Sequence, residues 1–176
     1  MTGLEPQRHV IVEIATLITD DHLNVVAEGP DLVIRASEEE LAQMGEFVSA
    51  MHTSSGLLGA IRSSHITIAE AEARTLAFLR EYISEEGSVP LCGNSIGTDR
   101  RFLQEYMPSL ESFFHYRNVD VSTVKELAKR WKPEVLTTRP EKVSSHRALD
   151  DIRESLAELI HYRETLFGQP ETLPAP

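Results

Sequence analysis

The sequence has 176 residues, which fits one domain, and 41% of them are apolar, which is enough for a hydrophobic core. Its 28 Asp and Glu residues outnumber its 17 Lys and Arg residues, giving a formal net charge of −11. This balance argues against a protein that coats long nucleic acid through a broad basic surface. It remains compatible with a nucleic-acid enzyme whose carboxylates hold metal ions, because the ions supply the positive charge that phosphate needs.

The sequence also bears on the cellular compartment. Cys92 is the only cysteine, so the chain cannot form an internal disulfide, as suits a reducing compartment. The first apolar stretch, residues 10–18, is interrupted by Glu13 and lacks the basic lead of a signal peptide. No segment approaches the roughly 18–20 uninterrupted apolar residues of a membrane span. We therefore expect a soluble, cytoplasmic protein with no membrane contact.

Hydrophobic periodicity and capping signals predict strands first, then strands alternating with helices. This order indicates an α/β class with a mixed sheet flanked by helices, in which residues 1–167 form one domain and residues 168–176 a disordered tail. In chain order, we predict strands at 9–19 and 25–34, a helix from Ser37 to about Ala50, a loop at 52–56 before a short helix, a helix from Thr67 that Gly87 ends, a buried strand at 89–92, a helix at 98–107, a strand at 118–121, a helix capped by Ser122 with Val124, Leu127, Ala128 and Trp131 as its apolar stripe, a loop at 133–140 and a helix at about 145–167.

The first cluster with possible chemistry is the small-residue stretch 93–98 followed by Asp99, between a predicted buried strand and a helix. Active sites of open α/β sheets lie at such carboxyl ends of strands. A purely structural interpretation is that Asp99 lies in the first helical turn and favours the helix dipole. Pattern alone leaves both interpretations open.

The second cluster, at the start of the last predicted helix, contains His146, Asp150 and Asp151. A histidine beside a carboxylate can act as a base or a metal ligand near neutral pH. Either aspartate would also favour the helix N-terminus, and helical geometry does not choose between them, since the two lie on opposite sides of the apolar stripe.

The third cluster is the aromatic and cationic run at residues 113–117, which ends with His115, Tyr116 and Arg117. Aromatic rings stack on bases, and an arginine can bind phosphate with two hydrogen bonds. The structural alternative is an aromatic cluster in the core or at an interface.

Taken together and in this order, these clusters resemble the oligoribonuclease family of DEDD exonucleases, which have the ribonuclease-H-like fold. The resemblance covers nearly the whole chain and identifies residues 1–167 as an exonuclease domain. The strings that carry it are Met1-Thr2-Gly3-Leu4, Ile14-Ala15-Thr16-Leu17, GNSIGTDRRF (93–102), FHYRNVDVSTVKELAKRWKP (114–133) and HRALDDIRES (146–155).

The resemblance implies a 3′-to-5′ exoribonuclease that degrades very short oligoribonucleotides, mainly dinucleotides, to nucleoside 5′-monophosphates. A site of four carboxylates and one histidine would bind two divalent cations, Mg²⁺ or Mn²⁺, which would activate a water and stabilise the leaving oxygen. Asp99 would be the second-motif ligand. Asp151, five residues after His146, would be the third-motif ligand in preference to Asp150. His146 would be the general base.

The family's substrate contacts also carry over by position. Leu4 resembles the apolar wedge between two bases, and Ser95 and Arg117 resemble part of a cap on the substrate's 5′ phosphate. In the family the partner subunit supplies the residues that match His115 and Tyr116, so a homodimer is implied. The Tyr116 position also counts as part of the active site. Such a cap would favour dinucleotides because a longer chain would run into it.

One motif departs from the family pattern. The family has Asp-x-Glu on a buried strand directly before the Met-Thr-Gly-Leu string, so both carboxylates would fall upstream of Met1 here. Glu5 lies past the wedge and Glu13 belongs to the next strand, so we expect neither to be a ligand. We expect either a start codon placed too late or a shortened protein, and the intact remainder of the site favours the first.

Two other functions are weighed against this one. A binding protein that keeps the phosphate cap but lacks two metal-ligand carboxylates would bind dinucleotides without cleaving them. A proofreading exonuclease acting on DNA is less favoured, because the aromatic string supplied by the partner fits short RNA better.

Overall fold

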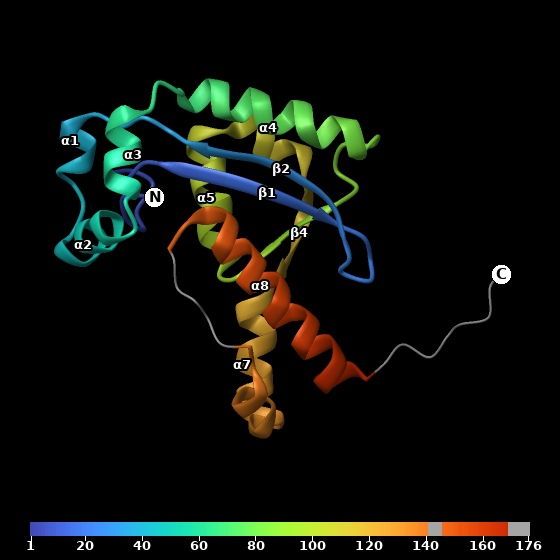
Figure 1. Cartoon of the computed structure of the whole chain (residues 1–176). Coiled ribbons are helices and arrows are strands. Elements are labelled where there is room, and N and C mark those ends of the chain that lie inside the picture. Colours follow the sequence, from blue (N-terminus) through green and yellow to red (C-terminus); the bar gives the residue numbers. More distant parts are fainter. Residues whose placement is uncertain (141–145, 169–176) are drawn as a thin grey trace.

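The computed structural model describes residues 1–140 and 146–168 (Figure 1). Its elements confirm the α/β class that the sequence predicts. In chain order they are β1 (Glu13–Thr19), β2 (Val25–Val33), α1 (Glu38–Leu41), α2 (Glu46–Ser54), α3 (Leu57–Ser63), α4 (Ile68–Tyr82), β3 (Pro90–Gly93), α5 (Ile96–Tyr106), α6 (Pro108–Phe113), β4 (His115–Asp120), α7 (Val121–Trp131), the 3-10 turn η1 (Pro133–Thr138), α8 (Ala148–Tyr162) and the π-helical turn η2 (Arg163–Phe167).

The four strands pair as two small sheets. β1 and β2 form an antiparallel hairpin, whose turn is closed by hydrogen bonds from the Leu23 amide to the Asp20 carbonyl and from the Asp20 amide to the Asn24 carbonyl. β3 and β4 run parallel. Within the described residues no ladder joins the two pairs. The predicted mixture of parallel and antiparallel strands is therefore present, but it is divided between two sheets because β3, only four residues long, pairs with β4 alone.

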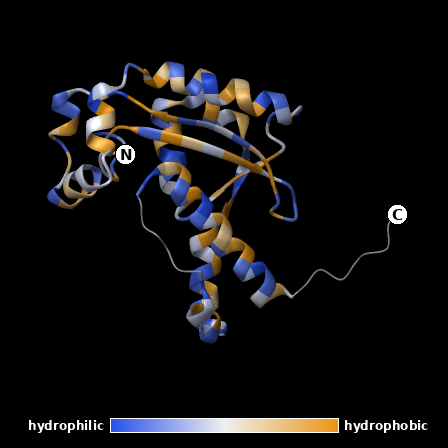
Figure 2. Cartoon of the chain, viewed as in Figure 1, coloured by the Kyte–Doolittle hydropathy of each residue, from blue (hydrophilic) through white to orange (hydrophobic). Residues whose placement is uncertain are grey.

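The helices cover the strands and enclose the core. α4 lies along β2, and α8 lies against β1 (Figure 1). The strands of the hairpin contain several hydrophobic residues (Figure 2). The main buried cluster joins the hairpin and the segment before it to α4, α5 and α6, and consists of Ile11, Leu32, Ile34, Ala71, Leu76, Leu79, Phe102, Leu103, Met107, Leu110 and Phe113.

Two predicted boundaries are wrong for identifiable reasons. Ser37 and Glu40 do form a reciprocal capping box, but the helix they open ends at Leu41, and Gly45 begins a second helix as its N-cap. The loop expected at 52–56 is therefore helical through Ser54. A short helix that was not predicted, α6, begins at Pro108, because proline suits the first helical turn.

The start of α7 also differs from the prediction. Asp120, not Ser122, is the N-cap, and its carboxylate accepts a hydrogen bond from the Ser122 amide at 2.9 Å. Trp131, the last residue of the predicted apolar stripe, is 76% exposed. Val121 and Ala128 instead pack with Val135 and Tyr162 in a small cluster between α7 and α8.

The remaining expectations on architecture are simpler. The loop predicted at 133–140 contains η1, and the last helix begins at Ala148 and turns π-helical after Tyr162. Of the predicted tail, residues 169–176 lie outside the described residues, as does Ser145. None of the described helices is long and apolar enough to cross a membrane.

Candidate active site

The N-terminal segment forms a closed loop that presents Leu4. The Thr2 amide donates to the Val10 carbonyl at 3.0 Å, and the Thr2 hydroxyl accepts from the Val10 amide at 2.9 Å. Gly3 is required beneath the His9 ring, because a Cβ at Gly3 would lie 2.4 Å from His9 Nε2. The loop is thus fixed where its two ends meet, and Leu4 is 70% exposed.

The corner between β3 and α5 carries Ser95 and Asp99. Ser95 is the N-cap of α5 in the left-handed conformation, with φ 53° and ψ 35°. The helix begins at Ile96, two residues before the predicted start, and so places Asp99 within its first turn. Burial raises the pKa of Asp99, and the nearby charge of Asp120 raises it further. This carboxylate is held where its ionised form needs a cation or a donor.

The start of α8 carries His146 and Asp151. His146 precedes the helix, is exposed and has a positive φ of 54°. Asp151 lies in the first helical turn, and its amide donates to the Arg147 carbonyl at 2.9 Å. Asp150 forms an ion pair with Arg153, at 3.5 Å between Asp150 Oδ1 and Arg153 Nη1. Asp150 is therefore engaged on the helix surface.

Residues from distant parts of the chain converge at Met1. Burial lowers the pKa of the Met1 amino group, and the charges of Asp99, Glu13 and Asp151 oppose that decrease. All three carboxylates therefore act electrostatically on this one amino group, although they come from distant parts of the chain. Asp99 of α5 and Asp151 of α8, which the resemblance places in the metal site, are two of these carboxylates.

His52 is a member of this region that the sequence analysis did not single out. His52 is a residue of α2 and is 3% exposed, and its Nε2 lies 3.0 Å from the Met1 carbonyl oxygen. Burial lowers the pKa of His52, and the charge of His146 lowers it further, so the two histidines lie in the same region. The sequence analysis predicted a loop at 52–56, so His52 was not assigned to a helix. Its burial could not be predicted, because a buried face follows from helical spacing.

The carboxylates suit a hard divalent cation. Mg²⁺ and Mn²⁺ prefer oxygen ligands, which Asp99 and Asp151 supply. Across residues 1–140 and 146–168, however, no three His, Cys, Asp or Glu side chains are gathered closely enough to hold a metal ion. Asp99 and Asp151 by themselves would make only part of a ligand set.

β4 presents the aromatic and cationic residues. The His115 and Tyr116 rings lie 4.4 Å apart between centroids, and the Arg117 guanidinium carbon lies 5.3 Å from the Tyr116 centroid. Tyr116 is 74% exposed, so this cluster faces solvent in the monomer. Arg100 anchors the strand, because its Nη1 donates to the His115 carbonyl at 2.8 Å.

Ser122 is a further residue that the sequence analysis placed only as a helix cap. Its hydroxyl donates to Asn94 Oδ1 at 3.0 Å and lies 3.0 Å from the Ser95 amide and 3.2 Å from the Ser95 hydroxyl. The spacing of Ser95 and Ser122 in the sequence gives no signal of this contact, which follows from the parallel pairing of β3 and β4.

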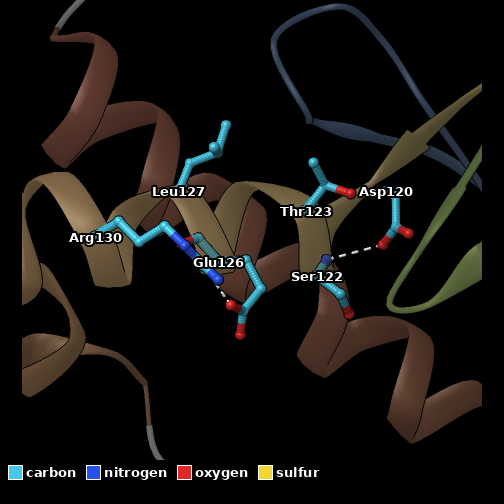
Figure 3. A pocket seen from close by; sticks show the side chains of 6 residues that line it. All are labelled: Asp120, Ser122, Thr123, Glu126, Leu127 and Arg130. Carbon is cyan, nitrogen blue, oxygen red and sulfur yellow. Dashed lines mark hydrogen bonds and ion pairs between the residues drawn. The ribbon is translucent and has the colours of Figure 1, made fainter.

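The same region of α7 lines a shallow recess on the surface (Figure 3). Within it, Glu126 and Arg130 form an ion pair one helical turn apart. The recess is lined by Asp120, Ser122, Thr123, Glu126, Leu127 and Arg130.

Comparison with known proteins defines the class. A sequence model of the family described as Exonuclease matches residues 1–159, which include Leu4, Asp99 and Asp151. The described α/β structure is consistent with the ribonuclease-H-like fold of such enzymes.

Curated relatives define the family more narrowly. An oligoribonuclease of Vibrio cholerae is 54% identical over 167 residues, covering 95% of this chain and 91% of the relative. One of Alkalilimnicola ehrlichii is 58% identical over 170 residues, covering 97% and 87%. One of Corynebacterium glutamicum is 56% identical over 167 residues, covering 95% and 76%. The chain belongs to the oligoribonuclease family of exonucleases.

Proposed function

We propose that the protein is a 3′-to-5′ exoribonuclease that degrades very short oligoribonucleotides, mainly dinucleotides, to nucleoside 5′-monophosphates. Membership of the family makes it a hydrolase of phosphodiester bonds and implies dependence on a divalent metal. The observation that carries the proposal is the 54–58% identity to curated oligoribonucleases over nearly the whole chain. The electrostatic effect of both Asp99 and Asp151 on the Met1 amino group supports it. We retain residues 1–167 as the exonuclease domain and the cytoplasm as its compartment.

Asp99 and Asp151 are the proposed ligands of two divalent cations, Mg²⁺ or Mn²⁺. When bound, such ions would activate the attacking water and stabilise the leaving oxygen. Burial of Asp99 supports this role, since its raised pKa reflects an ionised form that a cation would stabilise. His146, exposed at the start of α8, is the proposed general base that accepts the proton of the water.

Two groups of residues are proposed to bind the substrate, one at its bases and one at its 5′ phosphate. Leu4 is the proposed wedge between the two bases, which its exposure at a fixed loop supports. Ser95 and Arg117 are the proposed cap on the 5′ phosphate. The hydroxyl of Ser122 adjoins Ser95, and the guanidinium of Arg117 can neutralise phosphate charge.

A homodimer completes the proposal, with His115 and Tyr116 acting in the partner's site. β4 and α7 leave large apolar side chains exposed, among them Tyr116, Val119 and Trp131. Exposed apolar surface of this kind is typical of an interface, and aromatic residues are enriched there. Light scattering should therefore give twice the mass of one chain.

The assay must allow for the two carboxylates that the resemblance places before Met1. Hydrolysis of a 5′-phosphorylated diribonucleotide with Mn²⁺ is therefore measured for the 176-residue chain and for a chain extended by an Asp-x-Glu strand. We expect little turnover in the first and full turnover in the extended chain. Strong turnover without that strand would contradict the proposed ligand set.

Within the extended chain, Asp99→Asn or Asp151→Asn should lower kcat at least about 10³-fold, equivalent to about 4 kcal/mol of transition-state stabilisation. Asp150→Asn is the matched control, because Asp150 lies one residue away and pairs with Arg153 on the helix surface. Equal losses for Asp150→Asn and Asp151→Asn would refute the assignment. A dinucleotide-binding protein without hydrolysis is not favoured, and its affinity would not change when EDTA is added.

A further inference from the structure

Glu13, the first residue of β1, is a buried carboxylate whose two oxygens both contact the start of α8. Its side chain is 4% exposed. Oε1 accepts a hydrogen bond from Arg147 Nε at 2.7 Å and lies 2.6 Å from Arg147 Nη2. Oε2 accepts from the Ala148 amide at 2.8 Å. Glu13 thus binds the two residues that follow His146, although more than 130 positions separate it from them in the sequence.

These contacts replace a local helix cap. The N-cap residue of α8, Arg147, provides no capping hydrogen bond from its own side chain. The first amides of a helix need acceptors, and a negative charge near them is favoured by the helix dipole. Glu13 supplies both from another element, and its hydrogen bond raises the pKa of Arg147, as expected for a paired guanidinium.

The conformation of His146 gives the contact a further consequence. Its positive φ of 54° is unfavourable for a residue with a side chain, and such conformations persist only where surrounding contacts impose them. The Glu13 contacts fix the two residues that follow His146, and therefore its backbone direction. They also set where the first turn of α8, including Asp151, lies relative to β1.

We propose that Glu13 is a positioning residue of the hydrolytic site: it holds His146 and Asp151 in register with Asp99 without binding metal or substrate itself. This inference rests on the roles proposed above for these three residues. Glu13 is not available as a ligand, because its oxygens are occupied by Arg147 and Ala148. Supporting contacts of this kind typically affect metal affinity or activity by about 10–100-fold.

A second ion pair between the hairpin and α8 provides a matched control. Glu28 of β2 pairs with Arg153 of α8 at 2.6 Å between Oε2 and Nη2, with both side chains about half exposed. Glu13→Ala and Glu28→Ala therefore each remove a carboxylate that joins the hairpin to α8. Only Glu13→Ala removes one that contacts the segment carrying His146.

Three quantities are measured for both variants: Mn²⁺ affinity of the 176-residue chain by electron paramagnetic resonance, kcat and KM of the extended chain, and Tm without metal. We expect Glu13→Ala to weaken Mn²⁺ binding about tenfold and to lower kcat about 10–100-fold, with KM changed less than about twofold. Glu28→Ala should leave Mn²⁺ affinity, kcat and KM unchanged. Glu13→Gln should recover part of the loss, because its amide oxygen can still accept from Ala148.

The outcomes separate this inference from the proposed function. If Asp151→Asn retains activity, the proposed function fails whatever Glu13 does. If Asp151→Asn is inactive while Glu13→Ala has the Mn²⁺ affinity and kcat of the parent, the positioning role is overturned. Should Glu13→Ala not fold, Glu13→Gln decides: parental kcat and Mn²⁺ affinity would overturn the inference, and a partial loss in both would support it.

Discussion

The two ends of α8 are each held by a buried glutamate, but in opposite ways. At the N-terminal end, Glu13 comes from β1 and contacts the helix backbone and Arg147. In the C-terminal half, Glu158 belongs to the helix itself and gathers side chains from other elements. The Glu13 contacts hold the start of α8 against β1, whereas the Glu158 contacts hold side chains of neighbouring segments against α8.

Among the described residues, Glu158 contacts four side chains, which we call the Glu158 network, and one of them, Asn94, directly precedes Ser95. Glu158 is 2% exposed, and its oxygens accept from the Tyr162 hydroxyl at 2.8 Å, from Arg139 Nη1 at 3.3 Å and from Asn94 Nδ2 at 3.3 Å. Lys125 Nζ lies 3.5 Å from Glu158 Oε1. Because several groups share this carboxylate, we expect its loss to change stability, whereas loss of Glu13 changes the chemistry.

The largest expected effect on stability tests this contrast. Glu158→Ala removes the acceptor of the Tyr162 hydroxyl and the counter-charge that the partly exposed Arg139 and Lys125 share, and should lower the free energy of unfolding by about 1–3 kcal/mol. Glu158→Gln should cost less, because the amide still contacts the Tyr162 hydroxyl. Urea unfolding measures both. Wild-type stability of Glu158→Ala, or a kcat loss in its folded fraction as large as that of Glu13→Ala, would remove the distinction between the two ends.

The two glutamates also show what the sequence could reveal. Asp99 and Asp151 were identifiable because small residues, capping signals and familiar strings surround them. Glu13 lies in an apolar strand pattern, where it only interrupts the run, and its partners are more than 130 residues away. Local periodicity describes neighbours along the chain, so a carboxylate that caps a distant helix leaves no local signal.

The same reasoning explains the errors in the fold. Gly45 divides one predicted helix into two, and with that boundary misplaced the burial of His52 could not be recognised. The stripe on α7 was predicted as apolar, and its last residue, Trp131, is exposed. Periodicity identifies an apolar face without saying what covers it, and here the proposed covering is a second copy of the chain. The α/β class and the capping box at Ser37 were predictable, since both follow from local pattern.

A smaller effect, on KM, is expected at Ser122, which links Asn94 of the Glu158 network to Ser95. Ser122→Ala removes the hydroxyl that contacts both Asn94 and Ser95. A hydrogen bond of this kind contributes about 1 kcal/mol, so KM for a 5′-phosphorylated diribonucleotide should rise about fivefold. The expected kcat is unchanged, as is KM for the same substrate without its 5′ phosphate.

Ser112→Ala is the control for this variant, because Ser112 is an exposed serine on α6 whose hydroxyl bonds the Ser109 carbonyl. An equal rise in KM for substrates with and without the 5′ phosphate would show that Ser122 supports the fold rather than the cap.

The smallest effect concerns acid, which should act on the two ends of α8 unequally. At the Glu158 end, burial and the Glu158 hydrogen bond raise the pKa of Tyr162 to about 12, so Tyr162 keeps its proton at neutral and acidic pH. At the Glu13 end, burial lowers the pKa of His52 below its ordinary value near 6.5. Below that ordinary value the unfolded chain binds more protons than the folded one, so stability falls as pH decreases through the folded-state pKa of His52.

His52→Gln should reduce this acid-dependent loss while its amide keeps a donor for the Met1 carbonyl. The reduction amounts to about 1.4 kcal/mol for each pKa unit by which the two states differ. Urea unfolding at pH 7.5 and 5.5 gives the difference for each variant, and His65→Gln, at an exposed position, should match the parent. If His52→Gln loses as much stability on acidification as the parent, His52 is not the cause of the acid sensitivity near Glu13. Other groups near Met1 would then have to account for any difference between the two ends of α8.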